Sequence, residues 1–187
     1  MDTKNKILSA ALELFVENGF HNTSTASICK KAGLSTGILF HYFETKEKLI
    51  FELFLKLKAE FYETALERIM INEHFKDSLK EIWIGLLRWG IDHQREFQFL
   101  MQYHNSPFMD EVHENRIISD LHQALAEFVK VGMEKNRIKS MPVDYIMDLT
   151  MNMIYANVNY LLKNPGEDTE SFRELTWQVF WNTWKTE

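Results

Sequence analysis

The chain has 187 residues and a formal net charge of −6, with 26% charged and 13% aromatic residues. No segment approaches the roughly 20 uninterrupted apolar residues of a membrane span, and the N-terminus lacks the apolar run of a signal peptide. A single cysteine, Cys29, excludes an internal disulfide and a multi-cysteine zinc module. We therefore expect a soluble, cytoplasmic protein with no membrane partner, no cofactor and no metal site.

The charge is unevenly distributed along the chain. Residues 1–50 hold six lysines and five acidic residues, whereas residues 51–187 hold fifteen basic and twenty-two acidic residues. An acidic chain argues against a nucleic-acid partner, because phosphate binding usually requires a basic surface. The first fifty residues are the part of the chain that repels DNA least.

Apolar residues recur three and four positions apart along nearly the whole chain, so we expect an all-α fold. The first helix should end at Gly19, which can adopt the left-handed conformation; its apolar face carries Ile7, Ala11, Leu14 and Phe15. Capping residues and glycines bound the next three helices: one from Ser24 or Thr25 to Ala32 before Gly33, one capped by Ser35, and one capped by Thr45 that runs from Lys46 to about Ile71.

Five later helices are expected near residues 75–93, 95–104, 110–136, 143–163 and 169–185. The helix from residue 143 carries two adjacent apolar stripes, one of Ile146, Leu149, Met153, Ala156 and Tyr160 and one of Met147, Met151, Ile154, Val158 and Leu161. An arc this wide needs two covering surfaces, and the aromatic last helix supplies only part of one. A partner subunit is the natural second cover; the alternative is a monomeric bundle that buries both stripes.

The stretch GLSTGILFHYF, residues 33–43, is a poor helix by composition, because an interior glycine costs roughly 0.5 to 1 kcal/mol relative to alanine. On a helical wheel Leu39 and Phe43 lie together, while Gly37 and His41 lie opposite, with Thr36 and Phe40 beside them. A surface without bulk at Gly37 can approach another large molecule closely. Such an approach is what a recognition helix in the DNA major groove requires.

The run from Lys6 to Phe54 resembles the N-terminal domain of the tetracycline-repressor (TetR/AcrR) family. The matching features are ELFVENGF, Thr25 and Ile28, AGLSTG at the turn, LFHYF, and TKEKL opening the fourth helix. The resemblance implies a three-helix helix-turn-helix DNA-binding domain at residues 1–46. It also implies a larger helical domain at 47–187 that binds a ligand and dimerises through the last two helices, about 143–163 and 169–185.

The resemblance implies particular DNA contacts. Thr25 would contact phosphate, Thr36, Gly37, Ile38 and His41 would face the major groove, and Tyr42 and Lys46 would hold the backbone. The full predicted set is Ser24, Thr25, Ser35, Thr36, Gly37, Ile38, Phe40, His41, Tyr42 and Lys46. The chain departs from the family at Phe40, often a tyrosine, and at Ala26, an arginine in some members. Alternatively, Tyr42 is a core aromatic, Lys46 an ordinary surface lysine, and His41 packs against the fourth helix.

Aromatic residues and methionines in the larger domain could line a ligand cavity or simply fill the core. The candidate ligand-binding residues are Trp83, Trp89, Phe97, Met101, Tyr103, His104, Phe108, Met151, Tyr155 and Asn157. Asn157 lies on an apolar arc and must find a hydrogen bond there, to a ligand, to a dimer mate or to the backbone.

These features predict a ligand-responsive transcriptional regulator, most simply a repressor. As a homodimer it would bind a palindromic operator of double-stranded DNA, and a small apolar or aromatic effector would release it. The alternative is a DNA-bound adaptor that answers to a protein partner. We do not expect an enzyme, because the chain has no nucleophile motif, no glycine-rich phosphate loop and no helical His/Glu metal signature.

Overall fold

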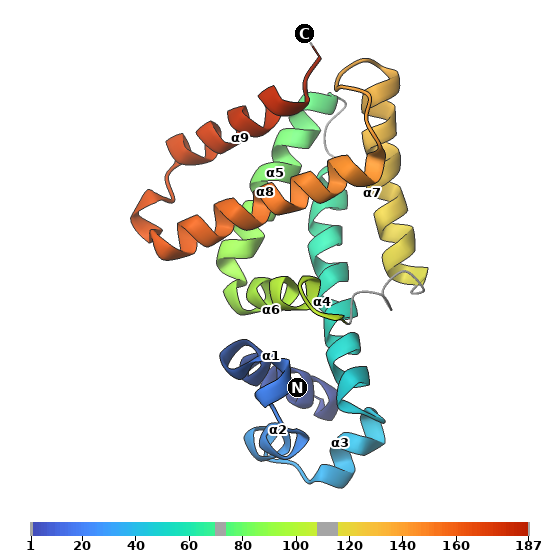
Figure 1. Cartoon of the computed structure of the whole chain (residues 1–187), viewed down its shortest axis with the longest axis vertical. Helices are drawn as coiled ribbons and strands as arrows, with labels where there is room; N and C mark the ends of the chain where they lie inside the picture. The colour runs from blue at the N-terminus through green and yellow to red at the C-terminus, as the bar shows by residue number, and fades with distance from the viewer. Residues whose placement is uncertain (1, 70–73, 108–115, 187) are drawn as a thin grey trace. The chain divides into compact units, whose positions relative to one another are not determined.

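The computed structural model describes residues 2–69, 74–107 and 116–186, and across these ranges the fold is all-α, as predicted (Figure 1). Its helices are α1 (Thr3–Asn22), α2 (Thr25–Ala32), α3 (Thr36–Tyr42), α4 (Lys46–Ile69), α5 (Phe75–Asp92), α6 (Gln94–His104), α7 (Arg116–Glu134), α8 (Val143–Lys163) and α9 (Glu170–Trp184), with a short 3-10 helix η2 (Pro165–Glu167) that the sequence did not predict. None of the helices in the described ranges is both long and apolar enough to span a membrane.

The first helices begin and end where their capping residues predict. Asp2 caps α1 by accepting a hydrogen bond from the Asn5 N–H (2.8 Å). Gly19 interrupts α1 with a φ of 78°, a conformation that favours glycine, although one further turn follows it. Gly33 ends α2 in the left-handed region, at φ 69° and ψ 34°. These two glycines fix where α1 bends and where the turn before α3 begins.

The caps of the next two helices differ from each other. Ser35 occupies the cap position of α3, but its side chain makes no capping hydrogen bond, so that part of the prediction is wrong. The Thr45 hydroxyl does cap α4, since it accepts from the Lys48 N–H at 3.1 Å. The short α3 is instead held by burial of Leu39 and of Phe43, which follows its last residue.

The chain divides into two compact units, and the division falls inside α4. Unit 1 comprises Met1–Lys58 and Arg95–Val112; unit 2 comprises Ala59–Gln94 and His113–Glu187. The first turns of α4 and nearly all of α6 therefore pack with the N-terminal helices. The functional boundary expected at residue 46, between a DNA-binding domain and a ligand-binding domain, stays a prediction.

Unit 1 is built around aromatic rings from α1, α4 and α6. Phe54 of α4 stacks on Tyr103 of α6, with ring centroids 3.9 Å apart. Phe99 of α6 packs edge-on against Phe20 at 5.4 Å and lies 6.2 Å from Phe15, both of α1. The Gln102 side-chain amide also donates to the Val16 carbonyl at 3.3 Å. These contacts pack α6 against α1 and α4 within unit 1.

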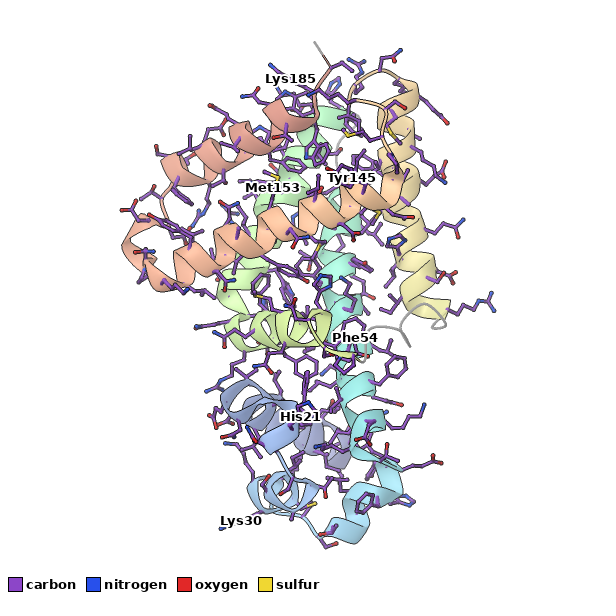
Figure 2. All side chains as sticks on the ribbon, in the orientation of Figure 1. His21, Lys30, Phe54, Tyr145, Met153 and Lys185 are labelled. Atoms are coloured by element: carbon purple, nitrogen blue, oxygen red, sulfur yellow. The ribbon has the colours of Figure 1, made fainter. Side chains whose placement is uncertain are left out.

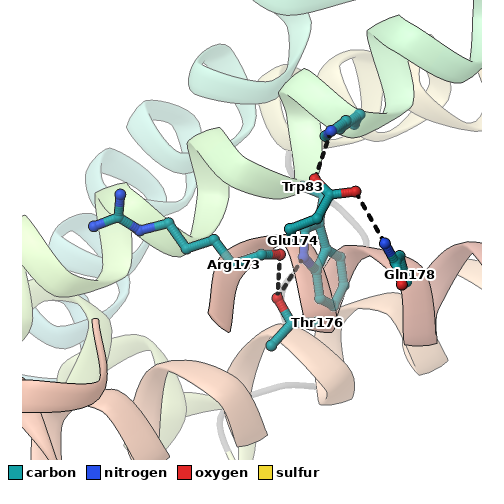
Figure 3. Close-up of polar contacts among 6 residues, drawn as sticks. Trp83, Arg173, Glu174, Thr176 and Gln178 are labelled. Carbon is teal, nitrogen blue, oxygen red and sulfur yellow. Dashed lines mark hydrogen bonds and ion pairs between the residues drawn. The ribbon is translucent and has the colours of Figure 1, made fainter. Parts of the chain in front are cut away.

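In unit 2, α5 contacts both α8 and α9. The Trp83 ring stacks on Phe180 at 4.4 Å, and its indole N–H donates to the Thr176 hydroxyl at 3.2 Å. The Thr176 hydroxyl in turn donates to the Arg173 carbonyl (Figure 3). The Glu174 carboxylate accepts a hydrogen bond from the Gln178 amide and forms an ion pair with Lys80 of α5. These polar and apolar contacts fix one face of α9 on α5, so the opposite face is turned outward.

Candidate nucleic-acid interface

The α2–turn–α3 segment is held from beneath by a small apolar core. Ile28 and Cys29 of α2 are buried together with Leu39 of α3 and the following Phe43. At the turn, the Gly33 N–H donates to the Lys30 carbonyl (3.3 Å) and the Leu34 N–H to the Cys29 carbonyl (3.0 Å). The buried thiol and the turn hydrogen bonds fix how α3 is presented.

All residues of α3 except Leu39 are exposed. Phe40 is 45% exposed and Ile38 is 38% exposed, which is unusual for large apolar side chains on a helix this short. At Gly37, apart from its chain neighbours and the adjoining backbone of its own helix, no heavy atom of the described chain lies within 4 Å of the position that a Cβ would occupy. Intramolecular packing therefore does not explain this glycine, and the space beside it is open to a partner.

Tyr42 and His41 lie at the surface. Tyr42 is 43% exposed and its ring lies 6.5 Å from Phe43, so the interpretation as a core aromatic is wrong. The exposed His41 ring packs edge-on against Tyr42 at 5.4 Å, so the ring contact of His41 lies within α3 itself. Both side chains keep polar atoms available at the outer face of α3.

Lys46 has a role that the sequence did not reveal. Its ammonium donates to the carbonyls of Phe20 (3.0 Å) and Thr23 (3.3 Å), at the end of α1. The buried Thr23 hydroxyl lies 2.9 Å from the Gly19 carbonyl, at the break in the same helix. Lys46 is thus more than an ordinary surface lysine, because it joins the start of α4 to the end of α1. Contact of its third N–H with DNA stays a prediction.

At the start of α2, the Ser24 hydroxyl accepts from the Ser27 N–H at 3.1 Å and so caps the helix, as predicted. Thr25 follows as the first residue of α2 and is half-buried. Ser35 and Thr36 are exposed at the start of α3. Phosphate contacts by these hydroxyls stay predictions.

The candidate ligand-binding residues do not gather in one unit. Phe97, Met101, Tyr103 and His104 belong to unit 1, whereas the other described candidates belong to unit 2: Trp83, Trp89, Met151, Tyr155 and Asn157. Phe108 lies outside the described residues. The Asn157 amide donates to the Met153 carbonyl at 2.8 Å, so the backbone is the partner that this side chain uses.

Unit 2 has a small apolar depression between α5, α8 and α9, with about 170 Å³ of empty space that is partly open to solvent. Its lining residues are Leu79, Ile82, Trp83, Leu86, Thr150, Ile154 and Phe180. Of the candidate ligand-binding residues, only Trp83 lines it. Within the described parts of the chain, no cluster of three histidine, cysteine or acidic side chains could hold a metal ion.

Two buried tyrosines, Tyr62 of α4 and Tyr155 of α8, also lie in unit 2. Burial raises the pKa of Tyr62 well above its usual value, with smaller contributions from Tyr155 and Asp148. Burial alone raises the pKa of Tyr155. The Tyr62 ring lies 6.4 Å from His122 of α7. Both hydroxyls therefore stay protonated, and sequence reasoning had named only Tyr155.

Helices α1 to α3, with an exposed α3 that follows a glycine turn, have the geometry of a helix-turn-helix DNA-binding unit. Residues 7–53 match the model for "Bacterial regulatory proteins, tetR family". The N-terminal helix-turn-helix part of this chain is therefore similar to that of the tetR family of transcriptional regulators.

Individual relatives show the same similarity. The chain is 40% identical over 87 residues to the HTH-type transcriptional regulator UidR of Escherichia coli K12, a match that covers 45% of this chain and only 42% of UidR. Over its full length it is similar to the crystal structure of a tetR family transcription regulator from Shewanella sp. PV-4, with 28% identity and a TM-score of 0.92.

A third comparison concerns the fold alone. The regulator FadR from Bacillus subtilis, solved in complex with stearoyl-CoA, has a TM-score of 0.75 and 20% identity, and the alignment covers 94% of this chain and 96% of that one. Together, these relatives are regulators of transcription rather than enzymes.

Proposed function

We propose that this regulator is a ligand-responsive repressor that binds a palindromic DNA operator as a homodimer and is released by a small apolar or aromatic effector. The observation that carries the proposal is the outer face of α3, where Gly37 leaves open space between exposed residues. A helix that enters the major groove needs such a face, because base edges lie at the bottom of the groove. A regulator of this kind acts in the cytoplasm, where the DNA is.

Exposed apolar residues on α8 and α9 support the homodimer. Of the first stripe predicted on α8, Ile146 is buried but Ala156 and Tyr160 are exposed, whereas Ile154, Val158 and Leu161 of the second stripe are buried. Tyr145 of α8 and Leu175 and Val179 of α9 are each more than half exposed. Figure 2 labels Tyr145 and Met153 along α8. Exposed apolar residues on two neighbouring helices are typical of a protein interface.

An effector would have to enlarge the interior of unit 2. The cavity volume of the depression, about 10 Å³, is far below the ~300 to 1,000 Å³ of most small-molecule pockets. The stearoyl-CoA complex of FadR supports the idea that this fold can open for a long apolar chain. A ligand that binds an open state better than the closed one shifts the population, and its difference in affinity limits the shift.

The small depression also favours a second candidate function, a DNA-bound adaptor controlled by a protein partner. A thermal-shift screen with apolar and aromatic compounds separates the two. A sensor gains stability with at least one compound class, because a ligand that binds only the folded state stabilises it. An adaptor shows no stabilising compound.

The DNA-binding claim is tested by incubating the purified protein with random duplex DNA near physiological salt and sequencing the retained duplexes. We expect a two-fold symmetric site whose half-sites lie about one helical turn apart, or a multiple of it. Retention of unrelated sequences only would contradict the proposal.

A further inference from the structure

The large apolar side chains on the exposed face of α3 are only partly buried by the fold. Phe40 and Ile38 flank the central position of His41, one on each side of the helix. Phe40 is 45% exposed, and its ring pairs with no other aromatic ring in the described chain. Covering the exposed part of this side chain with a partner is favourable, because it removes apolar surface from water. In the free protein, that exposed part contributes nothing to stability.

The partner chemistry follows from what a major groove offers. Base edges present hydrogen-bonding groups and one apolar group, the 5-methyl of thymine. A phenylalanine or isoleucine side chain cannot hydrogen-bond, so thymine methyls are the base feature that it can recognise. The exposed polar side chains of α3 are few: Thr36, His41 and Tyr42. On α2, Ala26 is exposed and also offers no base-reading group.

We propose that Phe40 and Ile38 determine specificity by contacting thymine methyl groups, so that each operator half-site carries thymines on either side of the position that faces His41. This inference rests on the proposed DNA-binding function and identifies which bases its recognition helix reads. Gly37 contributes by removing bulk beside Phe40, since open space at its Cβ position lets the helix lie close to the base edges.

Deoxyuridine tests the inference because it pairs with adenine as thymine does and lacks only the methyl group. A duplex recovered by selection is made again with one thymine at a time replaced by deoxyuridine, and binding of the full-length protein is measured by fluorescence anisotropy. At one or two positions per half-site, we expect binding to weaken about fourfold, as the loss of one buried methyl predicts. Thymines in the flanking sequence serve as internal controls and should be insensitive.

Variants then assign each methyl to a side chain. The Phe40→Ala variant should bind equally well to duplexes with thymine and with deoxyuridine at the position that Phe40 contacts. The Ile38→Ala variant should likewise lose the preference at the position that Ile38 contacts. Thermal unfolding confirms that both variants fold, as their exposure leads us to expect. Phe40→Leu keeps an apolar contact and should retain part of the preference.

The outcomes separate the two proposals. If the selected duplex binds but no thymine is sensitive, or the sensitivity persists in both alanine variants, the thymine inference is overturned and DNA binding stands. If no duplex is retained by selection, the proposed function fails and the inference fails with it.

Discussion

At the start of α3, glycine occupies a position where alanine would make a better helix. Gly37 lies in the first turn of α3, and nothing in the described chain would clash with a Cβ there. Alanine should therefore raise the free energy of unfolding by about 0.5 to 1 kcal/mol. It should also weaken specific DNA binding, because the added methyl holds α3 away from the bases. Thermal unfolding and anisotropy titrations measure the two effects; a stabler variant with undiminished DNA affinity would show that the open space has no role in recognition.

His41 provides a second test at the level of a single side chain. His41→Ala should weaken binding to the selected duplex by about 1 kcal/mol or more, the usual loss of a base contact, and leave dimerisation unchanged. His74→Ala is the matched control, since His74 is also exposed but lies before α5 in unit 2. Equal losses in the two variants would contradict the assignment.

Lys46 shows where reasoning from single residues falls short. Its position at the start of α4 was predictable, but its hydrogen bonds to Phe20 and Thr23 join residues 26 and 23 positions apart. No local pattern reports such a contact. Gly19, Gly33 and Thr45, in contrast, act through the backbone next to them, and their effects were predictable.

At the scale of elements, α9 is anchored on one face and exposed on the other. Leu175→Glu or Val179→Glu should raise the dissociation constant of the dimer at least tenfold, because burying a charge in an apolar interface is costly. The protomer should stay folded, since both side chains are exposed. Sedimentation measures the oligomeric state, and Gln123→Glu, which adds the same charge on the exposed surface of α7, is the control. A dimer that survives both α9 variants would place the interface elsewhere.

The burial of one tyrosine of α4 and one of α8 in unit 2 predicts that the free energy of unfolding depends on pH. Buried Tyr62 and Tyr155 have raised pKa values, whereas tyrosine in the unfolded chain ionises near pH 10. Their contribution to stability is therefore complete below about pH 10 and is lost as the pH rises above it, because only the unfolded chain then releases these protons. Tyr62→Phe should flatten the fall in unfolding free energy above pH 10, whereas the exposed Tyr145→Phe should leave it unchanged. An unchanged slope in Tyr62→Phe would refute this account.

Much of the element order was predictable, and the grouping of elements was not. The 3.6-residue pattern gave the helices, with α4 to α6 and α8 to α9 beginning and ending within a few residues of expectation. Membership of α6 in unit 1 depends on Phe54 stacking on Tyr103, residues separated by an entire intervening helix. The candidate ligand residues were chosen by composition alone, which explains why they fall into two units.

For the whole molecule, effector and DNA should act on one equilibrium. A compound that stabilises the protein and weakens DNA binding by some factor must itself bind more weakly to the DNA complex by the same factor. Calorimetric titration of that compound into the free protein and into the saturated DNA complex measures both affinities. Equal affinity of the compound for the free protein and for the DNA complex would contradict this coupling.

The central claim is that the exposed face of α3 enters the major groove twice per dimer. Dimethyl sulfate methylates guanine N7 in the major groove, so protection of the selected duplex from this reagent reports that contact directly. The account predicts two symmetric clusters of protected guanines about one helical turn apart, or a multiple of it. The protection of both clusters should be weaker with the Gly37→Ala variant. A single cluster, or full reactivity in the major groove of a duplex that the protein binds tightly, would contradict it.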